Sequence, residues 1–223
     1  MKKHGFTLAE VLITLTIIGV VAVLTLPALM TNTQEQQART ALGKMTSTLT
    51  NVAALSAAKD GIDYTGLTKV SAIADLDRDT TDAPSLLNLI ANNATINRSS
   101  DVINVENTDQ PISGFNMRVL FNDNTSMFFR STDDNSTAGA IQADGLPRGY
   151  VVIFDTNGNK GPNQISSCGG AAISAITGDD NNTCANKTNR FLKDRYLMVL
   201  RGTKVEPIGA ASVFLMTGST QTL

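Results

Sequence analysis

The sequence has little of several residue types on which common functions depend. Its only histidine is His4, so mechanisms that need a histidine base or a histidine-ligated metal have no candidate in the body of the chain. The 18 basic and 20 acidic residues give a net charge of -2, which excludes a general nucleic-acid-binding role of the histone or ribosomal type. No serine lies in a G-x-S-x-G context and no pair of carboxylates has the surroundings of a substrate pocket, so an enzyme is not expected.

Charge is also missing from a long N-terminal stretch, because residues 11–34 contain no charged side chain. Residues 11–30 read VLITLTIIGVVAVLTLPALM, in which three threonines are the only polar residues. This length matches the roughly 20 residues that a helix needs to cross a hydrocarbon core. Lys2 and Lys3 precede the stretch and no basic residue follows before Arg39, so the N-terminus is expected in the cytoplasm and the remainder outside.

Glu10 is the only acidic residue before Glu35, and it stands at the edge of this apolar stretch. A cleaved secretory signal is disfavoured, because the apolar run is too long and ends without a small-residue cleavage site. A simple signal anchor leaves the carboxylate unexplained. An ionisable residue in a membrane segment is by default a functional candidate, so Glu10 is expected to have a partner.

The opening KKHG, followed by FTLAEVLITLTIIGVVAVLTLPAL, resembles the leader and first helix of the type IV pilin and pseudopilin family. The resemblance covers roughly residues 1–60. It implies that a prepilin peptidase cuts between Gly5 and Phe6, and that the new amine of Phe6 is methylated. It also implies that Glu10 serves assembly by pairing with the Phe6 ammonium of a neighbouring subunit. Pro27 corresponds to the family's helix-kinking proline and predicts a bend or a melted stretch near residues 23–27, the alternative being the end of a membrane helix.

The resemblance further implies a structural subunit of a type IV pilus or a related pseudopilus. Its partners would be other pilin subunits, the prepilin peptidase, and the inner membrane with its assembly platform. The precursor would lie in the bacterial inner membrane, and the mature protein in an extracellular pilus or a periplasmic pseudopilus. Three alternatives remain open: a minor tip pilin that binds DNA or a surface ligand, a pseudopilin of a type II secretion system, and a monomeric membrane-anchored periplasmic domain.

The predicted organisation has four parts: a leader (residues 1–5), a transmembrane or filament-core helix (6–30), an amphipathic helix (31–61) and a head (62–223). The amphipathic face consists of Leu42, Met45, Leu49 and Val52, at spacings of three and four. With Gly61 as a stop signal, both helical parts are expected to form one helix from about Thr7 to Asp60.

The head is predicted to be mainly β, so that the fold class is α+β, with the long helix packed on an antiparallel sheet. Residues 62–111 are expected to be loops with one short helix after Ser85. Further elements are a hairpin within residues 115–130, strands at 149–155 and 195–202, and a last strand from Ser212.

Cys168 and Cys184 are too few and too widely spaced for a four-cysteine zinc site, but they suit one disulfide in an oxidising compartment. Because the chain is expected to be exported, a disulfide is favoured over two free thiols. Closing the loop of 15 intervening residues stabilises the fold by roughly 3 kcal/mol in the chain-entropy model.

The loop DTNGNKGPN places Asp155, Asn157 and Asn159 at alternate positions, which is the pattern of a possible calcium site. The EF-hand pattern fails, however, because Lys160 stands where glycine is needed and Ser166 where a bidentate glutamate belongs. The glycines and proline of the loop favour a turn between strands. Calcium is therefore the alternative, and no other cofactor is expected.

Six basic residues fall within residues 187–204, a region named here the basic segment, with Asp194 as its one acidic residue. A tip pilin could use them for phosphate contacts with DNA. Without neighbouring exposed aromatic residues for base stacking, ordinary solvated strand edges are favoured. The candidates are Lys187, Arg190, Lys193, Arg195, Arg201 and Lys204.

Overall fold

A computed structural model describes residues 5–65, 67, 85–96, 102–104, 115, 117–129, 140–141, 149–158, 160–168, 184 and 190–218, without the side chains of residues 27–32, 102–104 and 140–141. The chain divides into two compact units, a small unit (Met1–Gln37) and a large unit (Ala38–Leu223). The fold is α+β, as predicted: a long N-terminal helix is followed by an antiparallel β-sheet.

The first helix, α1 (Leu8–Asp60), contains 53 residues and confirms the predicted single helix. It ends where the sequence places its stop signal, because Gly61 adopts a φ of 69° that disfavours other residues. The N–H of Gly61 donates to the carbonyl of Ala57 at 3.1 Å and so satisfies one of the last helical carbonyls.

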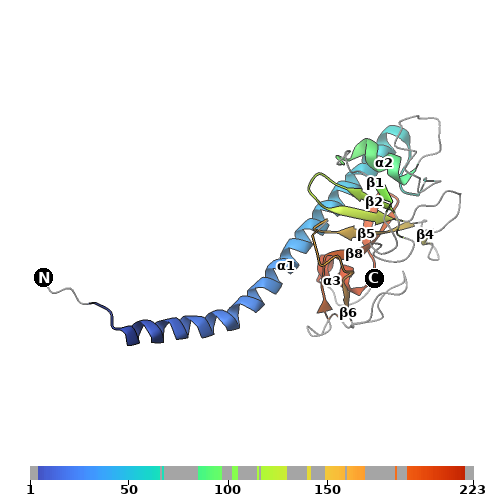
Figure 1. Ribbon diagram of the computed structural model, residues 1–223. Coiled ribbons are helices and arrows are strands. Elements are labelled where there is room, and N and C mark those ends of the chain that lie inside the picture. The colour runs from blue at the N-terminus through green and yellow to red at the C-terminus, as the bar shows by residue number, and fades with distance from the viewer. Residues whose placement is uncertain are drawn as a thin grey trace. The chain divides into compact units, whose positions relative to one another are not determined.

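The main sheet of the large unit consists, in the described residues, of seven strands in the order β1-β2-β3-β5-β8-β9, with β4 pairing with β5 (Figure 1). The predicted central strands, β5 (Gly149–Asp155) and β8 (Arg195–Arg201), pair with each other over seven residues and are the longest. The other strands are β1 (Val102–Asn104), β2 (Met117–Leu120), β3 (Ser126–Phe129), β4 (Ala140–Ile141) and β9 (Lys204–Pro207). A separate pair is formed by β6 (Ser167–Cys168) and β7 (Arg190–Phe191).

The core of the large unit lies between α1 and one face of this sheet. The four residues of the predicted amphipathic face are all buried, at 3% exposure or less. Alternate residues of β2, β3, β5 and β8 belong to the same core, as the period of two along a strand requires; they include Val119, Met127, Val152, Phe154, Tyr196 and Met198. The opposite face carries a smaller apolar cluster around Phe128, Ile153 and Leu197.

The predicted hairpin and the predicted short helix are both confirmed. Strands β2 and β3 pair as antiparallel neighbours across the turn at residues 122–125. Helix α2 (Leu86–Asn93) begins after Ser85, whose hydroxyl accepts a hydrogen bond from the N–H of Asn88 at 3.1 Å. The rest of the predicted connecting region, residues 62–111, lies largely outside the described residues.

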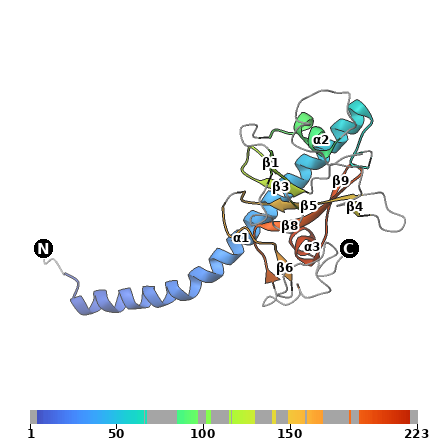
Figure 2. The same ribbon diagram turned by 45° about the vertical axis from the view of Figure 1, so that its right-hand side comes forward.

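The strand predicted from Ser212 is wrong, because this segment forms the helix α3 (Ala210–Thr217). A short apolar run fits a buried helix as well as a buried strand by periodicity alone. The flanking glycines decide the outcome: Gly209 has a φ of 80°, and Gly218 closes the helix in the left-handed conformation with its N–H donating to Phe214. Helix α3 contacts β6 and β8, beside which it lies in Figure 2.

Candidate functional site

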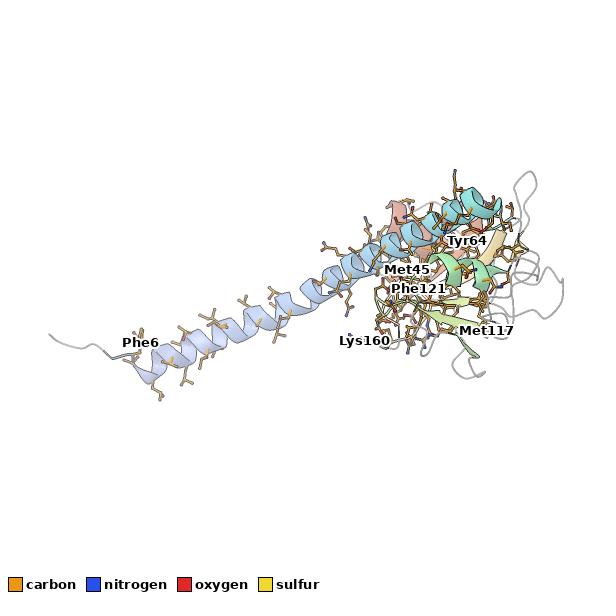
Figure 3. The ribbon with its side chains drawn as sticks, turned by 90° about the horizontal axis from the view of Figure 1, so that it is seen from above. Phe6, Met45, Tyr64, Met117, Phe121 and Lys160 are labelled. Carbon is orange, nitrogen blue, oxygen red and sulfur yellow. A yellow bond between two sulfur atoms is a disulfide. The ribbon has the colours of Figure 1, made fainter. Side chains whose placement is uncertain are left out.

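The predicted processing junction, between Gly5 and Phe6, lies immediately before α1. Both residues are exposed, Phe6 to 90%, and Phe6 marks the N-terminal end of the helix in Figure 3. A Cβ placed on Gly5 would meet no heavy atom of the described chain within 4 Å. The junction is thus accessible, and glycine allows an extended backbone to enter a protease cleft without an obstructing side chain.

Thr7 and Glu10 form a reciprocal cap at the start of α1. The backbone N–H and the hydroxyl of Thr7 both donate to Oε2 of Glu10, each at 2.8 Å, and the N–H of Glu10 donates to the Thr7 hydroxyl at 3.3 Å. This is a capping box, in which Thr or Ser is followed three residues later by Glu. This cap was not predicted from the sequence, although T-x-x-E before an apolar run is its signal. The cap holds the Glu10 carboxylate beside Thr7, the residue that follows Phe6.

The helical stretch Leu8–Leu26 is long and apolar enough to cross a membrane, with a mean hydropathy of 2.4. None of it is buried within the described molecule. Its three threonines each donate the hydroxyl hydrogen to a carbonyl of the preceding turn: Thr14 to Val11, Thr16 to Leu12 and Thr25 to Val21, at 2.8 to 2.9 Å. The threonine hydroxyls of the stretch therefore donate their hydrogens within the helix itself.

Pro27 does not interrupt α1, which continues from Leu8 to Asp60. The predicted melted stretch near residues 23–27 is therefore not found. The side chain of Pro27 lies outside the described residues. A role of Pro27 in assembly stays a prediction.

These observations describe one N-terminal arrangement. An accessible Gly-Phe bond is followed by a capped glutamate, and then by an exposed part of α1, residues 11–26, that has no charged side chain. Residues 1–26 match the family model of the prokaryotic N-terminal methylation motif. The chain carries the type IV prepilin signature. No curated protein and no solved structure matches the chain. The prepilin signature, together with the apolar helix, fits a membrane-anchored precursor, and it points to a structural subunit rather than an enzyme.

The loop after β5 is organised by the carboxylate of Asp155, which is fully buried. Its Oδ1 accepts hydrogen bonds from the N–H groups of Asn157 and Gly158, at 3.2 and 2.9 Å, and its Oδ2 accepts from Nε of Arg195 at 2.9 Å. Burial raises the pKa of Asp155 and outweighs the opposing effect of the Arg195 guanidinium. This long-range pair joins the last residue of β5 to the first residue of β8.

Asp194 fixes the other end of the same loop. Its two carboxylate oxygens accept hydrogen bonds from the N–H groups of Asn163 and Gln164, at 2.6 and 2.8 Å. Arg195 adds a bond from Nη1 to the carbonyl of Asn163 at 2.9 Å. Two carboxylates and one guanidinium thus bind the backbone at both ends of this loop.

The geometry of Asp155 bears on the predicted calcium ligands. Both of its oxygens accept hydrogen bonds from protein donors, so a calcium ion would have to displace Arg195 or the two backbone donors. Asn157 has a buried Oδ1 without a hydrogen-bond partner, and Asn159 lies outside the described residues. In the described part of the chain, no three His, Cys, Asp or Glu side chains are grouped so that they could hold a metal ion.

The basic segment does not present its charges on one surface. Arg195 is 7% exposed and bound to Asp155, and Arg201 pairs with Glu206 at 3.3 Å.

Arg190 also has partners: it donates from Nε to the carbonyl of Cys184 and lies over the ring of Phe214 at 4.0 Å. Lys193 and Lys204 are exposed, whereas Lys187 lies outside the described residues. The three arginines therefore have structural partners, which sequence spacing could not predict.

The predicted disulfide between Cys168 and Cys184 is confirmed, with 5.1 Å between the two Cα atoms. Both cysteines are buried in an apolar cluster with Ala210, Ala211 and Phe214 of α3. The residues between them, 169–183, lie outside the described residues. The disulfide and Arg190 together tie the strand pair β6-β7 to the C-terminal helix.

Proposed function

We propose that this protein is a structural subunit of a type IV pilus or a related pseudopilus, polymerised through α1 after removal of residues 1–5. Prepilin peptidase hydrolyses the Gly5–Phe6 peptide bond, which releases the leader and leaves a free amine on Phe6. An external methyl donor then supplies the methyl group of that amine. The mature helix thereby begins with an ammonium group directly before the Thr7–Glu10 cap.

The observation that carries this proposal is the position of the capped Glu10 carboxylate directly before an exposed stretch of α1, residues 11–26, that has no charged side chain. A helix that is apolar on all sides needs lipid or other apolar helices around it. In the membrane, Glu10 lies near the interface and can stay hydrated. In a filament core it needs an opposite charge, and the Phe6 ammonium of a neighbouring subunit supplies it.

The size of the electrostatic effect explains why both residue types are needed. Removing one partner of a buried ion pair costs roughly 3 to 5 kcal/mol, because an uncompensated charge is left in a medium of low polarity. In a polymer this penalty recurs at every subunit. Loss of Glu10 should therefore stop assembly, while the large unit still folds.

Mass spectrometry of the purified mature protein tests the processing step. The N-terminal peptide should begin at Phe6 and carry one additional methyl group. Replacement of Gly5 by a bulky residue should leave the leader attached. An intact leader on the wild-type protein, in cells that contain prepilin peptidase, would contradict the proposal.

Immunoblots of sheared-surface, periplasmic and membrane fractions test the assembly step. Filaments of the wild type should be recovered either in the sheared fraction, as for a pilus, or in the periplasm, as for a pseudopilus. Glu10→Ala should remain in the membrane fraction, processed and with the Cys168–Cys184 disulfide intact. Glu35→Ala is the matched control, because Glu35 is the next acidic residue of the same helix, and it should assemble normally. Equal assembly of Glu10→Ala and wild type would refute the role of Glu10.

A further inference from the structure

The large unit contains a cavity of about 380 Å³ between α1 and the β2–β3 turn. Its apolar floor is formed by Met45 of α1 and Phe121 of the turn, which lie side by side in Figure 3. Thr48 and Thr125 supply hydroxyl groups to the wall. Pockets of this size commonly hold ligands of small-molecule or side-chain dimensions.

One edge of the cavity is formed by an ion pair. Nζ of Lys44 lies 2.8 Å from Oδ2 of Asp123, and the two side chains are exposed by 62% and 26%. Although burial acts to raise it, the pKa of Asp123 lies below its usual value, because Lys44 and Thr125 donate hydrogen bonds to the carboxylate. Exposed pairs of this kind contribute little to stability, so Lys44 can leave Asp123 to another cation at low cost.

Elsewhere on the large unit an aromatic side chain is left without cover. Among the described residues of this unit, the large apolar side chains that are exposed are Leu55, at 42%, and Phe191, at 45%. Phe191 lies on β7, where it pairs with Ser167 of β6, next to the disulfide-bonded Cys168. Its position is thus fixed, and the exposed Lys193 follows two residues later.

Phe191 and the cavity each lie close in sequence to the same end of the strands β3, β5 and β8 of the main sheet. Ser126, Asp155 and Arg195 form one row across β3, β5 and β8. The turn that lines the cavity comes just before Ser126, and Phe191 comes shortly before Arg195. An apolar side chain and a complementary pocket at separate places on one molecule make a head-to-tail contact, which continues into a helical polymer unless the rotation closes a ring.

We propose that Phe191 of one copy inserts into the cavity between α1 and the β2–β3 turn of the next copy. The contact rests on the proposed function, because it adds a large-unit interface to a filament that α1 assembles. The cavity has room for a phenyl ring, and Met45 and Phe121 offer it an apolar floor. A cation also accompanies this ring, since the exposed Lys193 follows Phe191 by two residues and can take the place of Lys44 beside Asp123.

Cysteine cross-linking in intact filaments tests the contact directly. The double variant Phe191→Cys with Asn122→Cys places one thiol at the inserted residue and one at the cavity wall. Mild oxidation should give a ladder of covalent multimers, because a disulfide forms only when the two Cα atoms approach within roughly 7 Å. The matched control combines Leu55→Cys with Asn122→Cys and should give no ladder, nor should either single variant.

Side-chain truncation supplies a second measurement. Phe191→Ala should lower the resistance of filaments to detergent roughly tenfold or more, as expected for an aromatic anchor at an interface, whereas Leu55→Ala should leave it unchanged. Peptide mapping should first show the native disulfide in each variant. Wild-type filaments without a ladder in the double variant would overturn the contact alone, whereas a wild-type protein that never polymerises would overturn the proposed function.

Discussion

The buried pair between Asp155 and Arg195 gives the sharpest prediction about the large unit. Arg195 is only 7% exposed, and in Asp155→Ala its guanidinium loses its counter-charge. Its remaining described contacts are the carbonyl of Asn163 and the ring of Phe128, whose centroid lies 4.7 Å from the guanidinium carbon. Neither contact replaces a carboxylate. The N–H groups of Asn157 and Gly158 also lose their acceptor.

The expected cost follows from these losses. Breaking a buried ion pair by removing one partner costs roughly 3 to 5 kcal/mol of unfolding free energy. The matched control is Glu206→Ala, which removes the carboxylate of the pair with Arg201; Glu206 is 41% exposed. Because water screens such a pair, its loss should cost about 0 to 1 kcal/mol. The two substitutions should thus differ by at least about 2 kcal/mol.

Urea unfolding of the mature full-length protein in detergent measures this difference. The three tyrosines, Tyr64, Tyr150 and Tyr196, are all buried in the large unit, and the chain has no tryptophan. Tyrosine fluorescence therefore follows the unfolding of the large unit without a signal from the N-terminal helix. If Asp155→Ala is no less stable than Glu206→Ala, the pair does not hold the loop between β5 and β8 as argued.

Three further predictions concern single features. Replacing both Cys168 and Cys184 by serine should lower the unfolding free energy by roughly 3 kcal/mol, as measured by the same urea assay. Gly158→Ala should destabilise the large unit in that assay, because the new Cβ would lie 2.2 Å from a carbonyl oxygen of the β2–β3 turn and the residue has a φ of 67°; unchanged stability would contradict the close approach. Thr7→Val should speed hydrogen exchange in the first turn of α1 by removing the hydroxyl bond to Glu10, at a cost of about 1 kcal/mol, whereas Thr7→Ser should exchange like the wild type.

Local patterns predicted the elements whose sequence signals agree with their packing. The face formed by Leu42, Met45, Leu49 and Val52 packs as expected, because a stripe at helical spacing has one way to be buried. The strands at 149–155 and 195–202 were predicted with equal ease, since continuous apolar runs suit the centre of a sheet. The short helix from Ser85 was also predicted, and in the structure the hydroxyl of Ser85 caps it.

These local patterns could not predict ion pairs and hydrogen bonds between residues that are far apart in the sequence. Arg195 was grouped with neighbouring basic residues, yet its partner Asp155 lies 40 positions earlier in the sequence. Only the pairing of β5 with β8 brings the two together. The strand prediction from Ser212 was wrong for a different reason. Its apolar run suits either a helix or a strand, and the flanking Gly209 and Gly218 adopt conformations that favour the helix. The Thr7–Glu10 cap, in contrast, was available from the sequence by its spacing alone.

Because of the hydroxyl hydrogen bonds of Thr14, Thr16 and Thr25, these side chains need no polar partner from the apolar medium around the N-terminal part of α1. Each hydroxyl hydrogen is already donated to a carbonyl of the same helix, so no polar group of these side chains has to find or release a donor or acceptor when the surroundings change. Lipid tails and the aliphatic side chains of neighbouring helices are almost equally apolar. Moving residues 11–26 from one medium to the other is therefore nearly balanced in free energy, so that Glu10 is the group on which the direction of transfer depends.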